Sequence, residues 1–189
     1  MRRALLGACV FAGCILSASV PLASQEVIHA LTGTVRAINE NAKTITVFQD
    51  NGSEGVFQQM SNSKTRIAFD KKVADATTDA TKFDKSGAYA IVFYFGNSDN
   101  RTAVALKSLG AGPFESTVGT VTKVEGHNRI TVVDKAGAVH TFKIDKDTVA
   151  EGGMGVVVGD KFNVRNGDQM RVVSTAAGSD STALFMRQM

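Results

Sequence analysis

Two stretches of the chain share an alternation of polar and apolar residues that is typical of half-buried β-strands. Residues 32–38 and 118–124 both contain Gly-Thr-Val, and each is followed after a short turn by Ile-Thr-Val, at 45–47 and 130–132. Thr, Val and Ile favour strands, and the Asn, Asp and Gly residues that follow favour hairpin turns. In the first stretch the alternation breaks at Ile38, which indicates a β-bulge or the end of the strand. We therefore predict an all-β fold with two similar units in tandem.

The second unit supplies about five short strands. Beyond the two segments above, the pattern predicts a third strand at about residues 138–144 and a fourth at 161–165. The turn residues Asn166-Gly167 then lead into a fifth strand at 170–174. Five short strands can close into a barrel without exposed edges. This unit fits an oligonucleotide/oligosaccharide-binding (OB) barrel, and an SH3-like barrel nearly as well.

The first unit is longer because residues 70–87 lie between its third and fourth strands. Within this insert Val73, Ala76, Ala80 and Phe83 are spaced to line one side of a helix, although nearby threonines weaken that prediction. An OB barrel has three strands, then a helix, then two further strands along the chain. We therefore predict two tandem five-stranded barrels, with a short helix closing one end of the first.

Two glycines and a proline at residues 110–113 separate the units, since a strand cannot easily continue through them. We place the first barrel module at residues 25–110 and the second at residues 111–175. The tail, residues 176–189, begins small and polar and ends apolar. Its terminal position favours disorder over a clip onto a neighbouring module.

Residues 1–24 have the order of a cleavable export signal. Arg2 and Arg3 precede an apolar run at 4–16, and mostly small residues follow. The apolar run is shorter than the roughly 20 residues that a membrane-spanning helix needs. We therefore expect cleavage near Ser24 and no membrane span in the mature chain.

Both cysteines lie within this signal, which limits the chemistry of the mature chain. Without Cys9 and Cys14 it has no disulfide, no thiolate metal ligand and no thiol catalysis. Lipid attachment at Cys14 is an alternative, but Phe11 stands where lipoprotein signals usually have Leu, so we expect a periplasmic or secreted protein. Cleavage also lowers the formal net charge from +3 to +1, which argues against nucleic acid as a partner.

The export signal, the Gly-Thr-Val and Ile-Thr-Val segments and a later Val158-Gly159-Asp160-Lys161 together resemble small exported bacterial β-barrel repeat domains of unknown function. The resemblance covers about residues 31–174, and it implies the fold but no ligand and no site residue. The Gly-Thr-Val segment and the Val158-Gly159-Asp160-Lys161 segment are also similar to exported copper-binding barrels of the periplasm. Those proteins use a Trp with Met and His ligands, whereas this chain has no Trp.

The most apolar strand predicted in the mature chain is the candidate ligand surface. Tyr89, Phe93 and Phe95 fall on one of its faces, and Tyr94 falls on the other. An outward three-aromatic face would be a stacking platform for bases or sugars, and an inward one would be core. We favour core, because large aromatic side chains usually bury their area.

His140 is the remaining candidate for ligand binding. It shares a strand face with Phe142 and Ile144, so we expect it at a barrel mouth, where a hydrogen-bonded histidine is more common than a metal ligand. His29 and His127 lie in other contexts, before the first strand and in a turn. The three histidines therefore predict no metal site by themselves.

Two further groups have ligand chemistry but a simpler interpretation. Soft copper ligands could join His140 from three methionines: Met60, Met154 and Met170. Methionine is more often core filler. The acidic loop with Asp145, Asp147 and Glu151 lacks the ligand spacing of a calcium loop, so we expect a solvated turn.

No nucleophile elbow, phosphate-binding glycine loop or zinc-helix motif occurs in the sequence. We therefore expect no catalysis and no cofactor, and predict a binding or structural module of the bacterial cell envelope. An envelope protein or a glycan would be its partner. The alternatives are a periplasmic copper-binding protein and a hydrolase whose acidic residues are distant in sequence.

Overall fold

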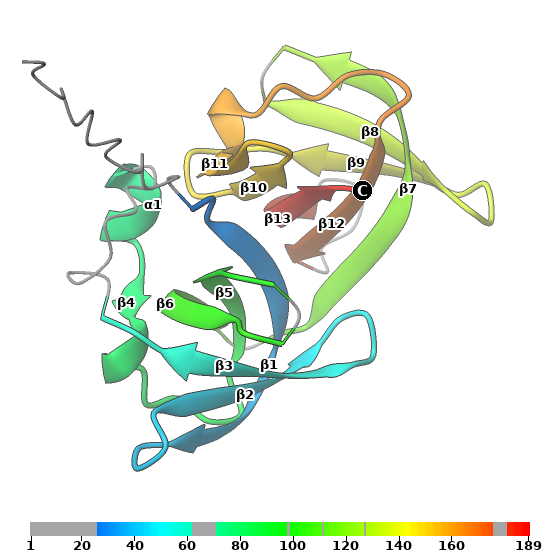
Figure 1. The fold of residues 1–189 in the computed structure, drawn as a ribbon. Helices are drawn as coiled ribbons and strands as arrows, with labels where there is room; N and C mark the ends of the chain where they lie inside the picture. Colours follow the sequence, from blue (N-terminus) through cyan, green and yellow to red (C-terminus); the bar gives the residue numbers. More distant parts are fainter. Residues whose placement is uncertain (1–25, 62–70, 98, 111, 127, 176–180) are drawn as a thin grey trace, which may run out of the picture.

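The computed structural model describes residues 26–61, 71–97, 99–110, 112–126, 128–175 and 181–189. The fold is all-β, as the sequence pattern predicts, and it consists of two separate sheets of six and seven strands (Figure 1). The first sheet ends with Gly110 and the second begins with Phe114. No helix within the described ranges is long and apolar enough to cross a membrane.

The first sheet closes into a five-stranded barrel, which we call barrel 1. Its strands are β1 (His29–Asn39), β2 (Thr44–Gln49), β3 (Glu54–Gln59), β5 (Tyr89–Phe95) and β6 (Thr102–Gly110). Their order is β3-β2-β1-β5-β6, and a short parallel pairing between β3 and β6 closes the ring. The two-residue strand β4 (Thr78–Asp79) pairs with the free edge of β6. This is the OB-like order that the sequence predicts.

The second sheet repeats the same arrangement in what we call barrel 2. Its ring consists of β7 (Phe114–Glu125), β8 (Arg129–Asp134), β9 (Val139–Lys143), β12 (Gln169–Thr175) and β13 (Ser181–Gln188), closed by parallel pairing of β9 with β13. A hairpin of β10 (Val149–Gly152) and β11 (Gly155–Val158) adds to β13 from outside the ring. The strand order is therefore OB-like in both barrels rather than SH3-like in the second.

The last two strands of barrel 2 differ from the prediction. Residues 161–165 form no strand, because the 3-10 turn Gly159–Lys161 leads into irregular chain, and the segment at 170–174 is the fourth strand of the ring. The fifth strand is β13, in the part of the chain that the sequence predicts to be a disordered tail. Its Ala183 and Met186 are fully buried in barrel 2, so apolar burial outweighs terminal position.

The insert of barrel 1 also differs from the predicted single helix. It contains α1 (Lys71–Asp75), β4 and the 3-10 turn Ala80–Lys82, while residue 70 lies outside the described ranges. Ala80 and Phe83 close the barrel 1 core as predicted, but Val73 packs elsewhere and Ala76 is exposed. The β-branched threonines between the two short helices favour extended chain.

The Gly-Thr-Val segments have the same structural role in both barrels. A Cβ atom on Gly33 would lie 2.3 Å from the backbone oxygen of Phe48, and one on Gly119 would lie 2.2 Å from that of Val133. Each glycine precedes a β-bulge, between Val35 and Ala37 in β1 and at the matching place in β7. The bulge lies slightly before the break in alternation that the sequence shows at Ile38, and it bends the strand around the barrel.

Three apolar clusters hold the molecule together, one inside each barrel and one between them. We call the third cluster the seam; it consists of Ile28, Ala30, Val73, Ile91, Phe93, Val104, Ala105, Val149, Val156, Val158, Val173 and Phe185. On the barrel 1 side its members come from β5 and β6, from the beginning of β1 with the residue before it, and from α1; on the barrel 2 side they come from β10 to β13. The outer faces of the two barrels are therefore buried against each other.

The close approach at Gly119 leads to a stability prediction. Gly119→Ala places a methyl group against the backbone of β8, so we expect the free energy of unfolding to fall by about 1 to 3 kcal/mol. Gly153→Ala is the matched control in the same barrel, since no atom lies within 4 Å of its added Cβ, and it should change stability by less than about 0.5 kcal/mol. Denaturant unfolding measures both, and equal stability of the two variants would contradict the prediction.

Candidate binding cleft at the seam

A cleft of about 510 Å³ opens at one end of the seam, where strand ends of both barrels meet. Its lining residues are Thr34, Asp50, Gly87, Tyr89, Gly110, Gly112, Phe114, Glu115 and Ser116. Most of the lining is polar. The lining includes two carboxylates, two hydroxyl side chains and one phenol, and three glycines expose backbone beside them. The cleft therefore offers many hydrogen-bonding groups.

The carboxylate of Asp50 is held in place by two donors. The Thr32 hydroxyl donates to Oδ2 at 2.5 Å and the Tyr89 phenol donates to the same atom at 2.6 Å. Among the described residues no hydrogen bond reaches Oδ1. Burial, and then the hydrogen bond to Asp50, raise the pKa of Tyr89 well above its usual range, so this phenol stays protonated and keeps donating. The result is an orientated carboxylate with one oxygen available to a ligand.

One wall of the cleft is a pair of aromatic rings from the two barrels. Tyr89 on β5 and Phe114 on β7 stack with ring centroids 5.0 Å apart and planes inclined by 22°. Gly87 and Gly110 have positive φ angles, and a Cβ at either would meet no atom within 4 Å. The rim beside the rings therefore leaves backbone open to close approach by a ligand.

The four aromatic candidates of β5 are divided between the seam and barrel 1. Tyr89, Phe93 and Phe95 point out of barrel 1, as an open platform would, but barrel 2 covers them and Phe93 is fully buried in the seam. Tyr94 points into the barrel 1 core, where its ring meets that of Phe57 edge-on. Of these four residues, Tyr89 is the one that lines the cleft.

His140 lies apart from the seam cleft and has a structural partner. Its Nε2 is 3.0 Å from Oδ2 of Asp134, and its ring stacks on Phe142 with nearly parallel planes. This hydrogen bond, together with backbone N–H groups of the turn, lowers the pKa of Asp134. The side chain is about one-third exposed, which fits a histidine at the barrel mouth.

The possible metal ligands are dispersed. Met170 lies inside barrel 2, Met154 is 98% exposed at the tip of the β10–β11 hairpin, and Met60 follows β3 of barrel 1. The Asp145 carboxylate accepts hydrogen bonds from backbone N–H groups of its own turn. In the part of the chain that is described, no three His, Cys, Asp or Glu side chains form a metal-binding group; His127 is outside that part.

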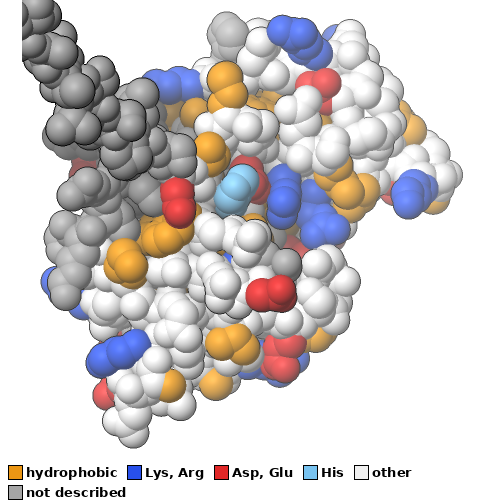
Figure 2. All heavy atoms as spheres, viewed as in Figure 1, with side chains coloured by type: hydrophobic (Ala, Val, Ile, Leu, Met, Phe, Trp, Pro, Cys, Tyr) orange, Lys and Arg blue, Asp and Glu red, His pale blue; other side chains and the backbone are white. Residues whose placement is uncertain are grey.

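A buried glutamate joins the two barrels elsewhere on the seam. The Glu151 carboxyl, only 4% exposed, contacts Nδ1 of His29 at 3.0 Å through Oε1 and Nε of Arg187 at 3.3 Å through Oε2. Figure 2 shows a histidine beside acidic and basic side chains where the two lobes meet. The prediction that Glu151 lies in a solvated turn is therefore wrong, because this residue is buried in strand β10. The signal in the sequence is an acid that directly follows Val149 and Ala150 in an apolar segment.

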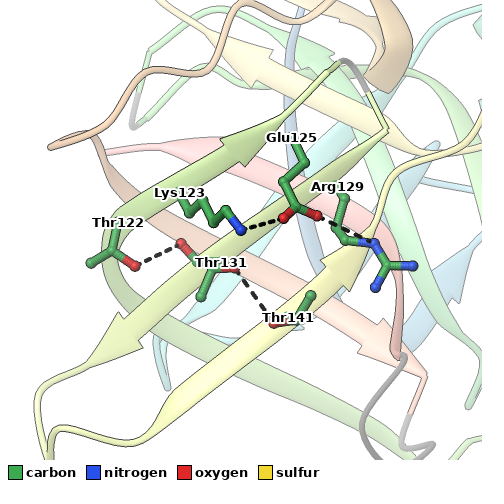
Figure 3. Close-up of polar contacts among 6 residues, drawn as sticks. All are labelled: Thr122, Lys123, Glu125, Arg129, Thr131 and Thr141. Carbon is green, nitrogen blue, oxygen red and sulfur yellow. Dashed lines mark hydrogen bonds and ion pairs between the residues drawn. The ribbon is translucent and has the colours of Figure 1, made fainter.

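The outer face of β7, β8 and β9 is polar but does not form a site (Figure 3). Lys123 Nζ and Arg129 Nε contact the same carboxylate, that of Glu125, at 2.5 Å and 3.9 Å. Thr131 and Thr141 lie side by side with their hydroxyl oxygens 3.5 Å apart. The ion pairs are solvent-exposed and contribute little to stability, so this face is best understood as a solvated surface.

The burial of Glu151 predicts an unusual pH dependence of stability. Burial raises its pKa against the opposing effect of Arg187 and His29, so the folded protein holds this proton more tightly than the unfolded chain does. The stability that this group contributes is complete below the ordinary carboxyl pKa and is lost as pH rises through the raised value. Glu151→Gln imitates the protonated form, so its stability relative to wild type should increase from about pH 4 to about pH 8.

Thermal and denaturant unfolding across that pH range measure this difference. Glu40→Gln changes an exposed acid in the β1–β2 turn and should leave a difference from wild type that hardly varies with pH. A difference for Glu151→Gln that stays constant, or that shrinks as pH rises, would show that the buried carboxyl is stabilising in its charged form.

Comparisons with known proteins add no functional information. No family model matches the chain and no curated protein sequence is similar to it. The seam cleft is therefore defined by its geometry: an orientated carboxylate, a stacked aromatic pair contributed by both barrels, and a polar rim with open backbone.

Proposed function

We propose that this chain is an exported, non-catalytic binding protein of the bacterial cell envelope that holds a glycan in the seam cleft. The observation that carries the proposal is the pairing of the Tyr89–Phe114 rings with the Asp50 carboxylate in one polar cleft. The export signal predicted in residues 1–24 supports a location outside the cytoplasm, where cell-wall glycans occur.

The chemistry of the cleft suits a sugar better than other small ligands. A flat aromatic ring packs against the C–H face of a sugar, and a fixed carboxylate accepts hydrogen bonds from neighbouring hydroxyl groups. Thr34 and Ser116 add donors and acceptors at the rim. Among the described lining residues the charged ones are the acids Asp50 and Glu115. Arg171 acts electrostatically on Tyr89 but is not itself a lining residue, so the lining favours neutral over anionic ligands.

Binding without turnover is supported by the state of the acidic groups. A glycoside hydrolase needs one carboxyl that keeps its proton to protonate the leaving group. Glu151 has a raised pKa, but it does not line this cleft. The Asp50 carboxylate already accepts hydrogen bonds from the Thr32 and Tyr89 hydroxyl groups, so it acts there as an acceptor. Because Asp50 and Glu115 both line the cleft, hydrolysis remains the alternative that an experiment must distinguish.

Tyrosine fluorescence during titration with N-acetylglucosamine oligomers tests the proposal. The chain has no tryptophan and two tyrosines, and of these Tyr89 lines the cleft while Tyr94 lies in barrel 1. We expect saturable binding that Asp50→Asn weakens roughly tenfold, because a charged acceptor is lost while the shape is kept. Tyr94→Phe should keep the fluorescence response.

Asp160→Asn is the matched control, since it makes the same chemical change at an exposed acid that does not line the cleft. It should leave the affinity unchanged. Equal weakening by Asp50→Asn and Asp160→Asn, or no binding of any oligomer, would contradict the proposal. Shortened oligomers after prolonged incubation, lost in Asp50→Asn, would show the hydrolase instead.

A further inference from the structure

A second cavity, of about 370 Å³, lies on barrel 2 and shares no lining residue with the seam cleft. We call it the hairpin groove, because the tip of the β10–β11 hairpin forms one side of it. Its lining residues are Gly152, Gly153, Met154, Gly155, Val157, Lys161, Phe162, Asn163, Arg165, Asp168 and Gln188. Unlike the seam cleft, it has a lining that is mostly apolar.

Exposed apolar side chains gather around the hairpin groove. Six large apolar side chains are exposed in the described part of the chain, and three of them lie here: Met154 (98% exposed), Met189 (67%) and Val27 (42%). Met189 follows the lining residue Gln188, and Val27 lies against Gly155. Soluble proteins seldom leave such side chains grouped in water without a use for them, and methionine adapts its shape to a ligand.

Phe162 connects the groove with the interior of barrel 2. It lines the hairpin groove and also a smaller cavity of about 70 Å³, whose other residues include Ile130 and Ile144 of the barrel 2 core. The ring lies close over the backbone at Gly152, where an added Cβ would be 2.8 Å from it. Phe162 therefore lies between the groove and apolar side chains of the barrel 2 core.

The rim of the groove carries an exposed arginine. Among the described lining residues the charged ones are Lys161, Arg165 and Asp168, and Arg165 is exposed. The Oδ2 atom of Asp168 accepts the backbone N–H of Arg165 at 2.8 Å, so this carboxylate is engaged by the Asn166-Gly167 turn. The exposed guanidinium of Arg165 at this rim therefore favours an anionic group.

We infer that the hairpin groove binds an amphiphile with an anionic head, of the fatty-acid type. The acyl chain lies along Phe162 beneath the Met154 hairpin, and the carboxylate lies near Arg165 and Lys161. A mostly apolar groove of about 370 Å³ has the size of a small-molecule site, and it suits a single acyl chain better than a broad protein partner. This inference is independent of the glycan proposal, because the two sites have different residues and opposite polarity.

The inference is tested by titrating the purified chain with octanoate, decanoate and decanol. Calorimetry measures the affinities, and the NMR signals of the methionine methyl groups locate the binding. Two added methylenes should tighten binding roughly tenfold, because each buries apolar area. Decanol, which has the chain without the charge, should bind about tenfold more weakly than decanoate. The Met154 methyl signal should shift with both carboxylates.

Three variants locate the site. Met154→Gln should weaken decanoate binding, and Arg165→Gln should remove most of the preference for decanoate over decanol. Val56→Gln, at a 57% exposed apolar residue of barrel 1, is the matched control and should have no effect. All three positions are exposed, and thermal unfolding checks that each variant keeps the fold.

Three results would overturn the inference: no binding of either carboxylate, equal affinity for octanoate and decanoate, or equal weakening by Met154→Gln and Val56→Gln. Undiminished preference for decanoate in Arg165→Gln would place the head group elsewhere and so reject the assigned orientation. Loss of glycan binding by Asp50→Asn with unchanged decanoate binding would confirm that the two sites act separately.

Discussion

Burial of apolar side chains between the two barrels is the interaction on which the rest of the structure depends. Each barrel has its own small core, but β5 also presents Ile91 and Phe93 outward, and barrel 2 presents Val173 and Phe185. Exposed to water, these faces would favour aggregation. Joined, they form a third core and bring Tyr89 of one barrel against Phe114 of the other. The seam cleft exists because the barrels pack together.

Polar contacts at the seam fix the orientation that apolar contact alone leaves open, since the hydrophobic effect has no direction. Glu151 accepts contacts from His29 of barrel 1 and Arg187 of barrel 2. The Lys107 ammonium of barrel 1 donates to the backbone oxygen of Asp147 at 2.6 Å, and burial lowers its pKa. Glu151 is buried and Lys107 is half-buried. Burying charged groups is costly, and in some proteins such groups select one packing arrangement among several.

The sequence predicts strands such as β1 and β7, in which one face is buried and the other is exposed to solvent. In these strands the alternation of polar and apolar residues indicates which face is exposed. It does not predict where Phe93 and Tyr94 point, because β5 is apolar on both faces and both are buried, one in the seam and one in barrel 1. β13 is missed for a related reason: its Ala183 and Met186 become core only through pairing with strands far away in the chain. The Asp50–Tyr89 bond likewise joins residues 39 positions apart, which no local pattern reveals.

The seam joins corresponding faces of the two barrels. By position in the ring, β5 and β6 of barrel 1 correspond to β12 and β13 of barrel 2, and all four strands contribute to the seam, together with the β10–β11 hairpin. In a two-fold homodimer, corresponding surfaces of two identical subunits pack on each other. In such a dimer every substitution occurs in both subunits. Here the two barrels belong to one chain, so each can change without the other. The covalent link also keeps the barrels at a high effective concentration relative to each other. Covalent linkage thus frees the molecule from two-fold symmetry: Asp50 and Glu151 each occur once, and one end of the seam has become a polar cleft.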